Sequence, residues 1–318
     1  MQLRLSHFVI LMASFLMISS CKETSDNAVH FFRYNESAGI ATLDPAFAKN
    51  QSLMWAVHQL YNTLVETNDD MKMIPSAAIR WEYADDNKRL RFFLRKDIYF
   101  HDNTAFPSGK GRRMVANDVV YSLSRIINPE VASPGAWIFH DIVDSIAPFT
   151  AISDSVFEIH LLRPYAPILG VLSMPYCSIV PKEAIEHYGK DFRKHPVGTG
   201  PFQLKLWEEG QALLLQKNPH YFETDNSGRH LPYLDGIHVN FLDSKTSEFL
   251  AFRQNKIDFI NDMDPSFKDE ILTKTGQLKD KWKDRIVLEK HPYLNTEYLG
   301  ILMQDSEVGH SPLQNKKI

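Results

Sequence analysis

The sequence predicts a mixed α/β fold, because apolar residues recur with the two-residue period of strands and the 3.6-residue period of helices in interspersed stretches. A hydrophobic content of 44% is typical of a protein with a packed core, and 318 residues suffice for about two domains. The formal net charge of −4 argues against a nucleic-acid binder, which needs a basic excess. The two cysteines exclude a disulfide scaffold and a four-thiolate zinc site.

Residues 1–20 are predicted to be a secretory signal peptide outside the fold. Arg4 precedes an apolar run of about eleven residues, whereas a membrane-spanning helix needs roughly 20. The run ends in Ile18-Ser19-Ser20-Cys21, which resembles the bacterial lipobox, so Cys21 is the expected lipidation site. The polar residues 21–27 indicate a tether. We therefore expect a protein anchored by lipid through Cys21 on the periplasmic side of the cell envelope. The alternative is an ordinary signal peptide with an incidental cysteine.

The first half of the mature chain is predicted to contain two strands, a loop and two helices. A short apolar and aromatic run predicts a strand at 29–34, and apolar residues at helical spacing over four turns predict a helix at 50–67. Alternation of apolar residues with arginines predicts a strand at 89–100. Two glycines and a proline mark a loop at 103–113, and one-sided apolar residues predict a helix at 116–127.

The second half is predicted to add three strands and three helices. Phe157, Ile159 and Leu161 alternate with polar residues, which predicts a strand. Pro181 and Gly189 are typical of the start and the end of a helix. Further strands are expected at 213–216 and 237–242, and further helices at 246–255 and 266–275.

No pattern in the sequence indicates catalysis, a cofactor or a metal site. The thirteen histidines form no His-Glu-x-x-His arrangement, and no Cys-x-x-Cys pair occurs. Gly198-Thr199-Gly200 lacks the lysine and serine of a phosphate-binding loop, and no nucleophile elbow is present. Cys177 lies in an apolar stretch and is expected to be a buried, inert thiol. The residues alone therefore favour a binding protein over an enzyme.

Five segments then occur in a fixed order along the chain. They are Leu43-Asp44-Pro45 with the helix after it, 90–102, 116–125, 198–202 with 218–222, and 233–237 with 256–259. In this order they resemble the family 5 bacterial extracellular solute-binding proteins, the oligopeptide and dipeptide receptors of ABC importers. The resemblance covers about residues 30–318.

The resemblance implies a periplasmic-binding-protein fold of class II, in which two lobes enclose a ligand cleft and the first lobe carries an inserted extra domain. Residues 28–46 and 170–290 would form lobe I, and residues 47–169 would form the inserted domain. Residues 291–318 would supply the crossing strand and the start of lobe II, and the rest of that lobe is expected to be missing.

The resemblance also implies a lipoprotein that captures peptides and delivers them to the permease and ATPase of an ABC importer. Main-chain hydrogen bonds, as in strand addition, would let one receptor accept many peptide sequences. His101, Asp102 and the turn at 198–201 match family motifs and are expected to be structural. The candidate ligand contacts are Asn35 and Glu36 after the first strand, Trp137 in the inserted domain, Asn261 and Asp262 after the strand at 257–259, and Tyr298 on the crossing strand.

Other interpretations remain open from the sequence. Within the same fold, the ligand could instead be a nickel chelate, haem, an opine or an oligosaccharide. A secreted lipoprotein hydrolase is an alternative of another class, although no nucleophile and base are paired in the sequence. A non-functional truncated fragment is the third alternative.

Replacing Cys21 tests the predicted lipid anchor. One acyl chain gives only marginal membrane binding, with a constant of about 10⁴ M⁻¹, whereas two or more chains give stable anchoring. We expect Cys21→Ser to release the protein from the membrane or to leave it as the uncleaved precursor, as measured by fractionation and intact mass. Wild-type protein that is soluble and begins downstream of Cys21 would contradict the prediction.

Overall fold

The computed structural model describes residues 29–261, 263–290 and 298–299. The chain divides into two compact units, Met1–Asp262 and Met263–Ile318, and each is described by itself. The expected signal peptide, the tether with Cys21, Asp262 and most of the expected crossing strand lie outside the described residues. Among the helices of the described part, none combines the length and the apolar character that a bilayer crossing requires.

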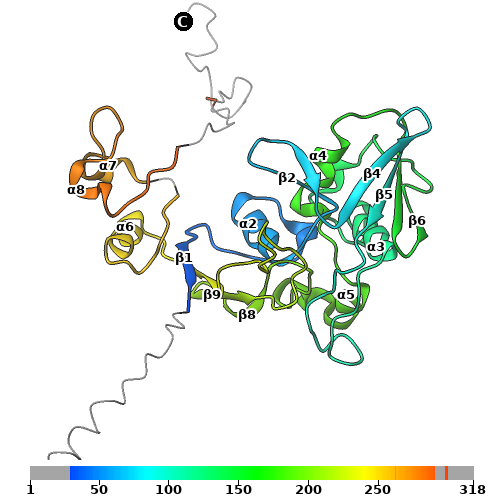
Figure 1. The fold of residues 1–318 in the computed structure, drawn as a ribbon, viewed down its shortest axis with the longest axis horizontal. Helices are drawn as coiled ribbons and strands as arrows, with labels where there is room; N and C mark the ends of the chain where they lie inside the picture. Colours follow the sequence, from blue (N-terminus) through cyan, green and yellow to red (C-terminus); the bar gives the residue numbers. More distant parts are fainter. Residues whose placement is uncertain (1–28, 262, 291–297, 300–318) are drawn as a thin grey trace, which may run out of the picture. The chain divides into compact units, whose positions relative to one another are not determined.

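The first unit contains a four-stranded sheet whose strands come from distant parts of the sequence. Its strand order is β1 (Phe31–Asn35), β10 (Gly236–Asn240), β9 (Ala212–Lys217) and β8 (Phe202–Glu208) (Figure 1). β1 runs parallel to β10, and the other neighbouring strands are antiparallel. The strands expected at 29–34, 213–216 and 237–242 are therefore confirmed, whereas β8 was not predicted.

A second four-stranded sheet is formed by β4 (Ala78–Ala84), β5 (Arg89–Leu94), β7 (Val156–His160) and β6 (Phe149–Ser153), in that order. All neighbouring strands in it are antiparallel. Helix α3 (Ala116–Ile127) packs against β6 and β7 and has the predicted bounds. It buries Val119, Leu123 and Ile126, which recur at helical spacing on one face. Both sheets and this helix confirm the mixed α/β class.

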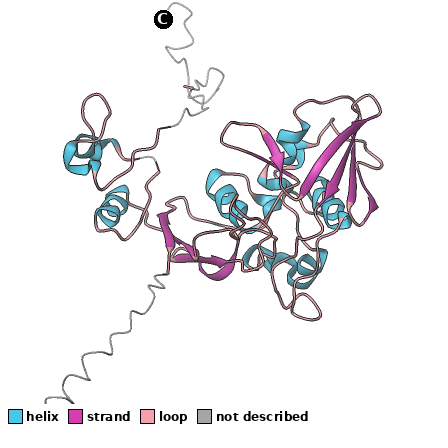
Figure 2. Cartoon of the chain, viewed as in Figure 1, coloured by secondary structure: helices cyan, strands magenta, loops and turns pink. Residues whose placement is uncertain are grey.

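Short elements complete the two units (Figure 2). In the first unit these are the strand pair β2 (Val65–Thr67) and β3 (Met73–Pro75), the helices α2 (Gln51–Leu60), α4 (Ile168–Leu172), α5 (Lys182–Tyr188) and α6 (Lys245–Arg253), and the 3₁₀ turns η1 (Pro45–Phe47), η2 (Ala136–Ile138), η3 (Pro175–Cys177) and η4 (Gly189–Lys194). The second unit contains α7 (Pro265–Ile271) and α8 (Asp280–Lys283).

The predicted helix at 50–67 is wrong beyond Leu60. α2 ends there because the next residue is extended, with φ −134° and ψ 161°. The chain then bonds to distant segments: the Ile179 N–H donates to the Asn62 carbonyl (3.0 Å), and residues 77 and 78 donate to the carbonyls of 63 and 64. The apolar side chains that follow α2 are thus buried by tertiary contacts, and residues 65–67 form β2.

Three other predicted elements differ from the structure at their ends or in their form. The strand expected at 89–100 ends at Leu94. The helix expected at 266–275 ends at Ile271, because Leu272 is extended and forms a bridge with Leu278. Of the expected crossing strand, residues 298 and 299 are described, and both lie outside any strand.

A buried ion pair joins two of the segments that carry the family resemblance. The two terminal guanidinium nitrogens of Arg125, in α3, donate to the Asp44 carboxylate at 3.1 and 2.8 Å, and both side chains are almost fully buried. Asp44 also caps η1 by accepting from the Ala46 N–H. This two-pronged geometry fixes α3 against the turn after β1.

A close chain crossing joins the turn at 198–201 to the end of α2. A Cβ added to Gly198 would lie 2.1 Å from the Leu60 carbonyl oxygen, so no larger residue fits there. His101 is fully buried against the same turn. Its main-chain N–H and its Nε2 bond to the carbonyls of Gly198 and Gly200 at 2.8 and 3.0 Å, and its Nδ1 accepts from the Gly198 N–H at 3.3 Å. His101 and the turn therefore have the structural role expected from the sequence.

His101 makes the stability of the protein depend on pH. Burial lowers the pKa of its imidazole from 6.5 to about 4, although the Gly200 carbonyl and Asp102 favour the charged form. Between these two pH values the unfolded chain binds more protons than the folded chain, so stability falls as the pH drops through this window. The full loss in the free energy of unfolding across this window is about 3 kcal/mol.

We therefore expect the free energy of unfolding, measured by urea titration, to decrease between pH 6.5 and pH 4 in the wild type. His101→Gln should be less stable at pH 7 and should show a flatter pH dependence. His140→Gln is the matched control, because His140 is exposed. If the free energy of unfolding of His101→Gln fell with pH as steeply as that of the wild type, this role for His101 would be contradicted.

Candidate functional site

Three chain segments end at one edge of the first sheet, the edge at which the carboxyl ends of its parallel strands lie. β1 and β10 are parallel, with Asn35 opposite Asn240, so their carboxyl ends meet there. Phe259 forms a parallel bridge with Tyr34 and extends this arrangement on the other side of β1. A two-pronged ion pair between Arg33 and Asp258 holds the added segment in place, with bonds of 2.6 and 3.0 Å. Ligands of open α/β sheets bind outside the carboxyl ends of strands, so this edge is the candidate site.

Asn35 is the residue that ties this edge together. Its Oδ1 accepts from the Leu242 N–H at 2.6 Å, and its Nδ2 donates to the Leu242 carbonyl at 3.1 Å and to a Glu248 carboxylate oxygen at 3.2 Å. The amide thereby fixes the chain that leaves β10 and orients the first turn of α6. Asn35 lies at the site, but its side chain is occupied by structural bonds.

Glu36, Glu248 and Lys245 give the site its charge. Glu36 is half-buried, and burial together with the nearby Glu248 raises the pKa of its carboxyl group, against the opposing effects of the Ala38 N–H and Lys245. The Lys245 ammonium lies 3.0 Å from the buried Glu248 carboxylate. It also donates to the Asn261 carbonyl at 3.4 Å. The structure therefore brings Asn35, Glu36 and Asn261 together around α6.

Among the remaining candidate residues, Trp137 is not joined to this cluster in the described part of the chain. The Trp137 side chain is 66% exposed on η2, and Tyr298 is 86% exposed in the second unit. Asp262 lies outside the described residues. Lys245 and Glu248 were not among the predicted site residues, although Lys245 immediately precedes the helix predicted at 246–255 and Glu248 lies in its first turn.

The described residues offer little for catalysis. No group of three or more histidine, cysteine or acidic side chains among them could hold a metal ion. Cys177 is free and buried, and burial raises the pKa of its thiol, so it is the inert thiol expected from the sequence. The chemistry available at the strand ends is hydrogen bonding and charge, which suits ligand binding.

The fold is that of a class II periplasmic binding protein. The chain belongs to the bacterial extracellular solute-binding proteins, family 5, since the model of the middle region of that family matches residues 72–318. The similar proteins with assigned roles are solute-binding proteins.

Three similar proteins illustrate the family. The dipeptide-binding protein of Escherichia coli strain K12 is 26% identical over 272 residues, covering 81% of this chain and 47% of that protein. DppA of Helicobacter pylori, solved with the peptide STSA, has a TM-score of 0.65 and 26% identity over 76% of this chain and 48% of its own. MoaA of A. tumefaciens R10, solved with mannopinic acid, has a TM-score of 0.63 and 28% identity over 73% of this chain and 44% of its own. The chain thus spans less than half the length of each relative.

Two substitutions distinguish the structural role of Asn35 from the charge of Glu36 at this site. They are Asn35→Ala and Glu36→Gln. Asn35→Ala removes the side-chain partner of the Leu242 N–H and carbonyl and one of the two partners of Glu248, which keeps Lys245, and should lower the free energy of unfolding by about 1–3 kcal/mol. Glu36→Gln relieves repulsion with Glu248 and should change stability by less than about 0.5 kcal/mol. Urea unfolding of both variants at pH 7 tests this, and equal destabilisation by the two would contradict it.

Proposed function

We propose that this chain captures peptides at the strand-end site as the solute-binding component of an ABC importer. The observation that carries the proposal is the meeting of the ends of β1 and β10 with the bridged segment at Phe259, where Asn35, Glu36 and Asn261 lie together. Membership of family 5 and the similarity to a dipeptide-binding protein and to a peptide-bound structure support a peptide as the ligand.

The proposed binding mode relies on main-chain hydrogen bonds. All peptides share the same main-chain donors and acceptors, so a site of this kind discriminates weakly between side chains. The half-buried Glu36 carboxylate adds a negative charge that would favour a ligand ammonium group. In the cell, the protein would act on the periplasmic side of the envelope, held by lipid at Cys21, and would deliver its ligand to the permease and ATPase.

A small acidic sugar conjugate is the second candidate ligand. The similarity to a structure solved with mannopinic acid, at 28% identity, favours it. Such a ligand carries carboxylate and hydroxyl groups, which would pair with Lys245 rather than with Glu36.

Ligand analysis of the purified protein distinguishes the candidates. We expect mass spectrometry of co-purified ligands to find short peptides. Calorimetry with a set of tripeptides that differ in their side chains should give dissociation constants within about tenfold of one another, which is a spread of about 1.4 kcal/mol. Recovery of only an opine, haem, a metal chelate or a sugar would overturn the peptide assignment, and turnover of a chromogenic ester would favour the hydrolase.

A further inference from the structure

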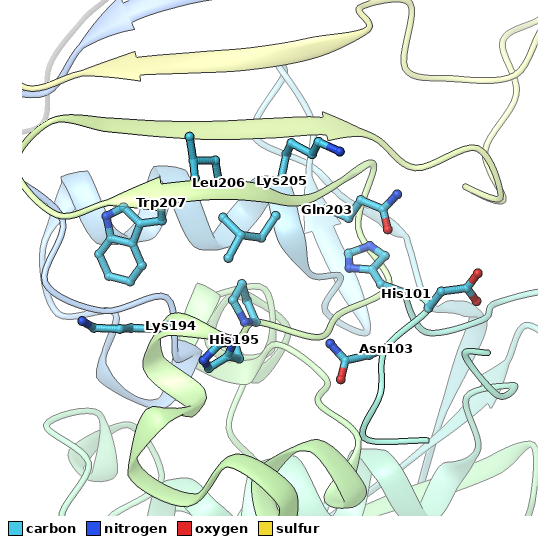
Figure 3. Close-up of a pocket in the computed structure, with 11 residues that line it drawn as sticks. His101, Asn103, Lys194, His195, Gln203, Lys205, Leu206 and Trp207 are labelled. Atoms are coloured by element: carbon cyan, nitrogen blue, oxygen red, sulfur yellow. The ribbon is translucent and has the colours of Figure 1, made fainter. Parts of the chain in front are cut away.

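A cavity of about 430 Å³ lies beside β8, the edge strand of the first sheet. Five consecutive residues of the strand, 203–207, line it. The register of β8 against β9 shifts between Leu204 and Leu206, so β8 is bulged there, and the cavity follows the strand through this bulge. Figure 3 shows Gln203, Lys205, Leu206 and Trp207 along the strand, with His101, Asn103, Lys194 and His195 across the cavity from it.

The free edge of β8 presents main-chain groups to this cavity. β8 is hydrogen-bonded to β9 on one side, and no other described strand pairs with it. In the described part of the chain, the main chain of residues 203–207 bonds to no segment other than β9. Unpaired strand edges accept an additional strand readily, and proteins usually cover or distort them. In the described part of the chain no strand covers this edge, and the bulge between Leu204 and Leu206 distorts only its centre.

The side chains around the cavity carry a positive excess. Asp102 is the one acidic residue in its lining, and the Lys110 ammonium neutralises it at 2.7 Å. Glu209 is shared between Lys194 and Arg193, at 3.1 and 2.6 Å. Lys205 is exposed and forms no ion pair with any described residue. Together with their direct partners, these groups comprise four cationic side chains against two carboxylates.

An unsatisfied donor lies in the same lining. The Trp207 indole N–H is buried and has no hydrogen-bond partner, the single such side-chain atom recorded among the described residues. A buried polar group without a partner costs about 1–3 kcal/mol.

We propose that the cavity receives an extended acidic segment of a partner protein, which adds as a strand to the free edge of β8. The row of five residues requires a main chain of similar length, which a small anion lacks. Carboxylates of the segment lie against Lys205 and Lys194, and its main chain pairs with β8. In the sheet order β8 is the strand furthest from β1, so this surface is separate from the strand-end site and independent of the ligand bound there.

Hydrogen exchange on the full chain tests the proposal with a defined probe. The probe is a blocked pentapeptide of alternating acidic residues and valines, and it should protect the amides of 202–208. Lys205→Glu should weaken binding about tenfold, and added salt should weaken it in the wild type. Lys72→Glu is the matched control, because Lys72 is an exposed lysine on the turn between β2 and β3; it should bind as the wild type does.

Three further probes make the test decisive. The same peptide with N-methylated main-chain amides should lose its protection of β8, because it cannot pair with a strand. A lysine–valine peptide should not bind. Equal binding of the N-methylated peptide, equal protection by succinate, protection at 240–248 instead of β8, or no binding at all would each overturn the proposal.

Discussion

The close crossing of the turn at 198–201 over the end of α2 is the constraint on which the first unit depends. Asn62, which follows α2, accepts from the Thr199 hydroxyl at 3.0 Å and hydrogen-bonds to the Tyr221 hydroxyl at 3.2 Å. Asn218 donates to the Gly200 carbonyl at 3.0 Å. Buried polar groups are costly unless they are paired, so these bonds specify one register of the crossing. The crossing holds the segments that lead into β2 and β8, and thereby links the β2–β3 pair to the first sheet.

Much of this fold follows from local pattern, and the differences have tertiary causes. Helix α3 was predicted to the residue because its amphipathic pattern coincides with a local cap: the Asp118 carboxylate accepts from the Val115 N–H at 2.8 Å. The excess length predicted for α2 arises because distant segments bury the residues after Leu60. β4, by contrast, was missed although Ile79, Trp81 and Tyr83 alternate with Arg80 and Glu82, the pattern that marks a strand.

The candidate site, like the fold, could be predicted from the sequence only in part. Asn35, Glu36 and Asn261 were named because the family resemblance puts the ligand cleft after the strands expected at 29–34 and 257–259, and the structure brings these residues to one edge. Lys245 and Glu248 contribute through the direction in which α6 starts, and no local pattern records that direction. Trp137 was chosen from the resemblance alone, and the structure gives it no link to the strand ends in the described part.

The buried pair of Arg125 and Asp44 and the bonds of Asn62 have a consequence for how such receptors diversify. These residues belong to the segments by which the family is recognised, and all of them serve the scaffold. Cargo preference can therefore change without any alteration in the recognisable segments. Two relatives agree with this: one was solved with the tetrapeptide STSA and the other with mannopinic acid, so similar folds hold different ligands.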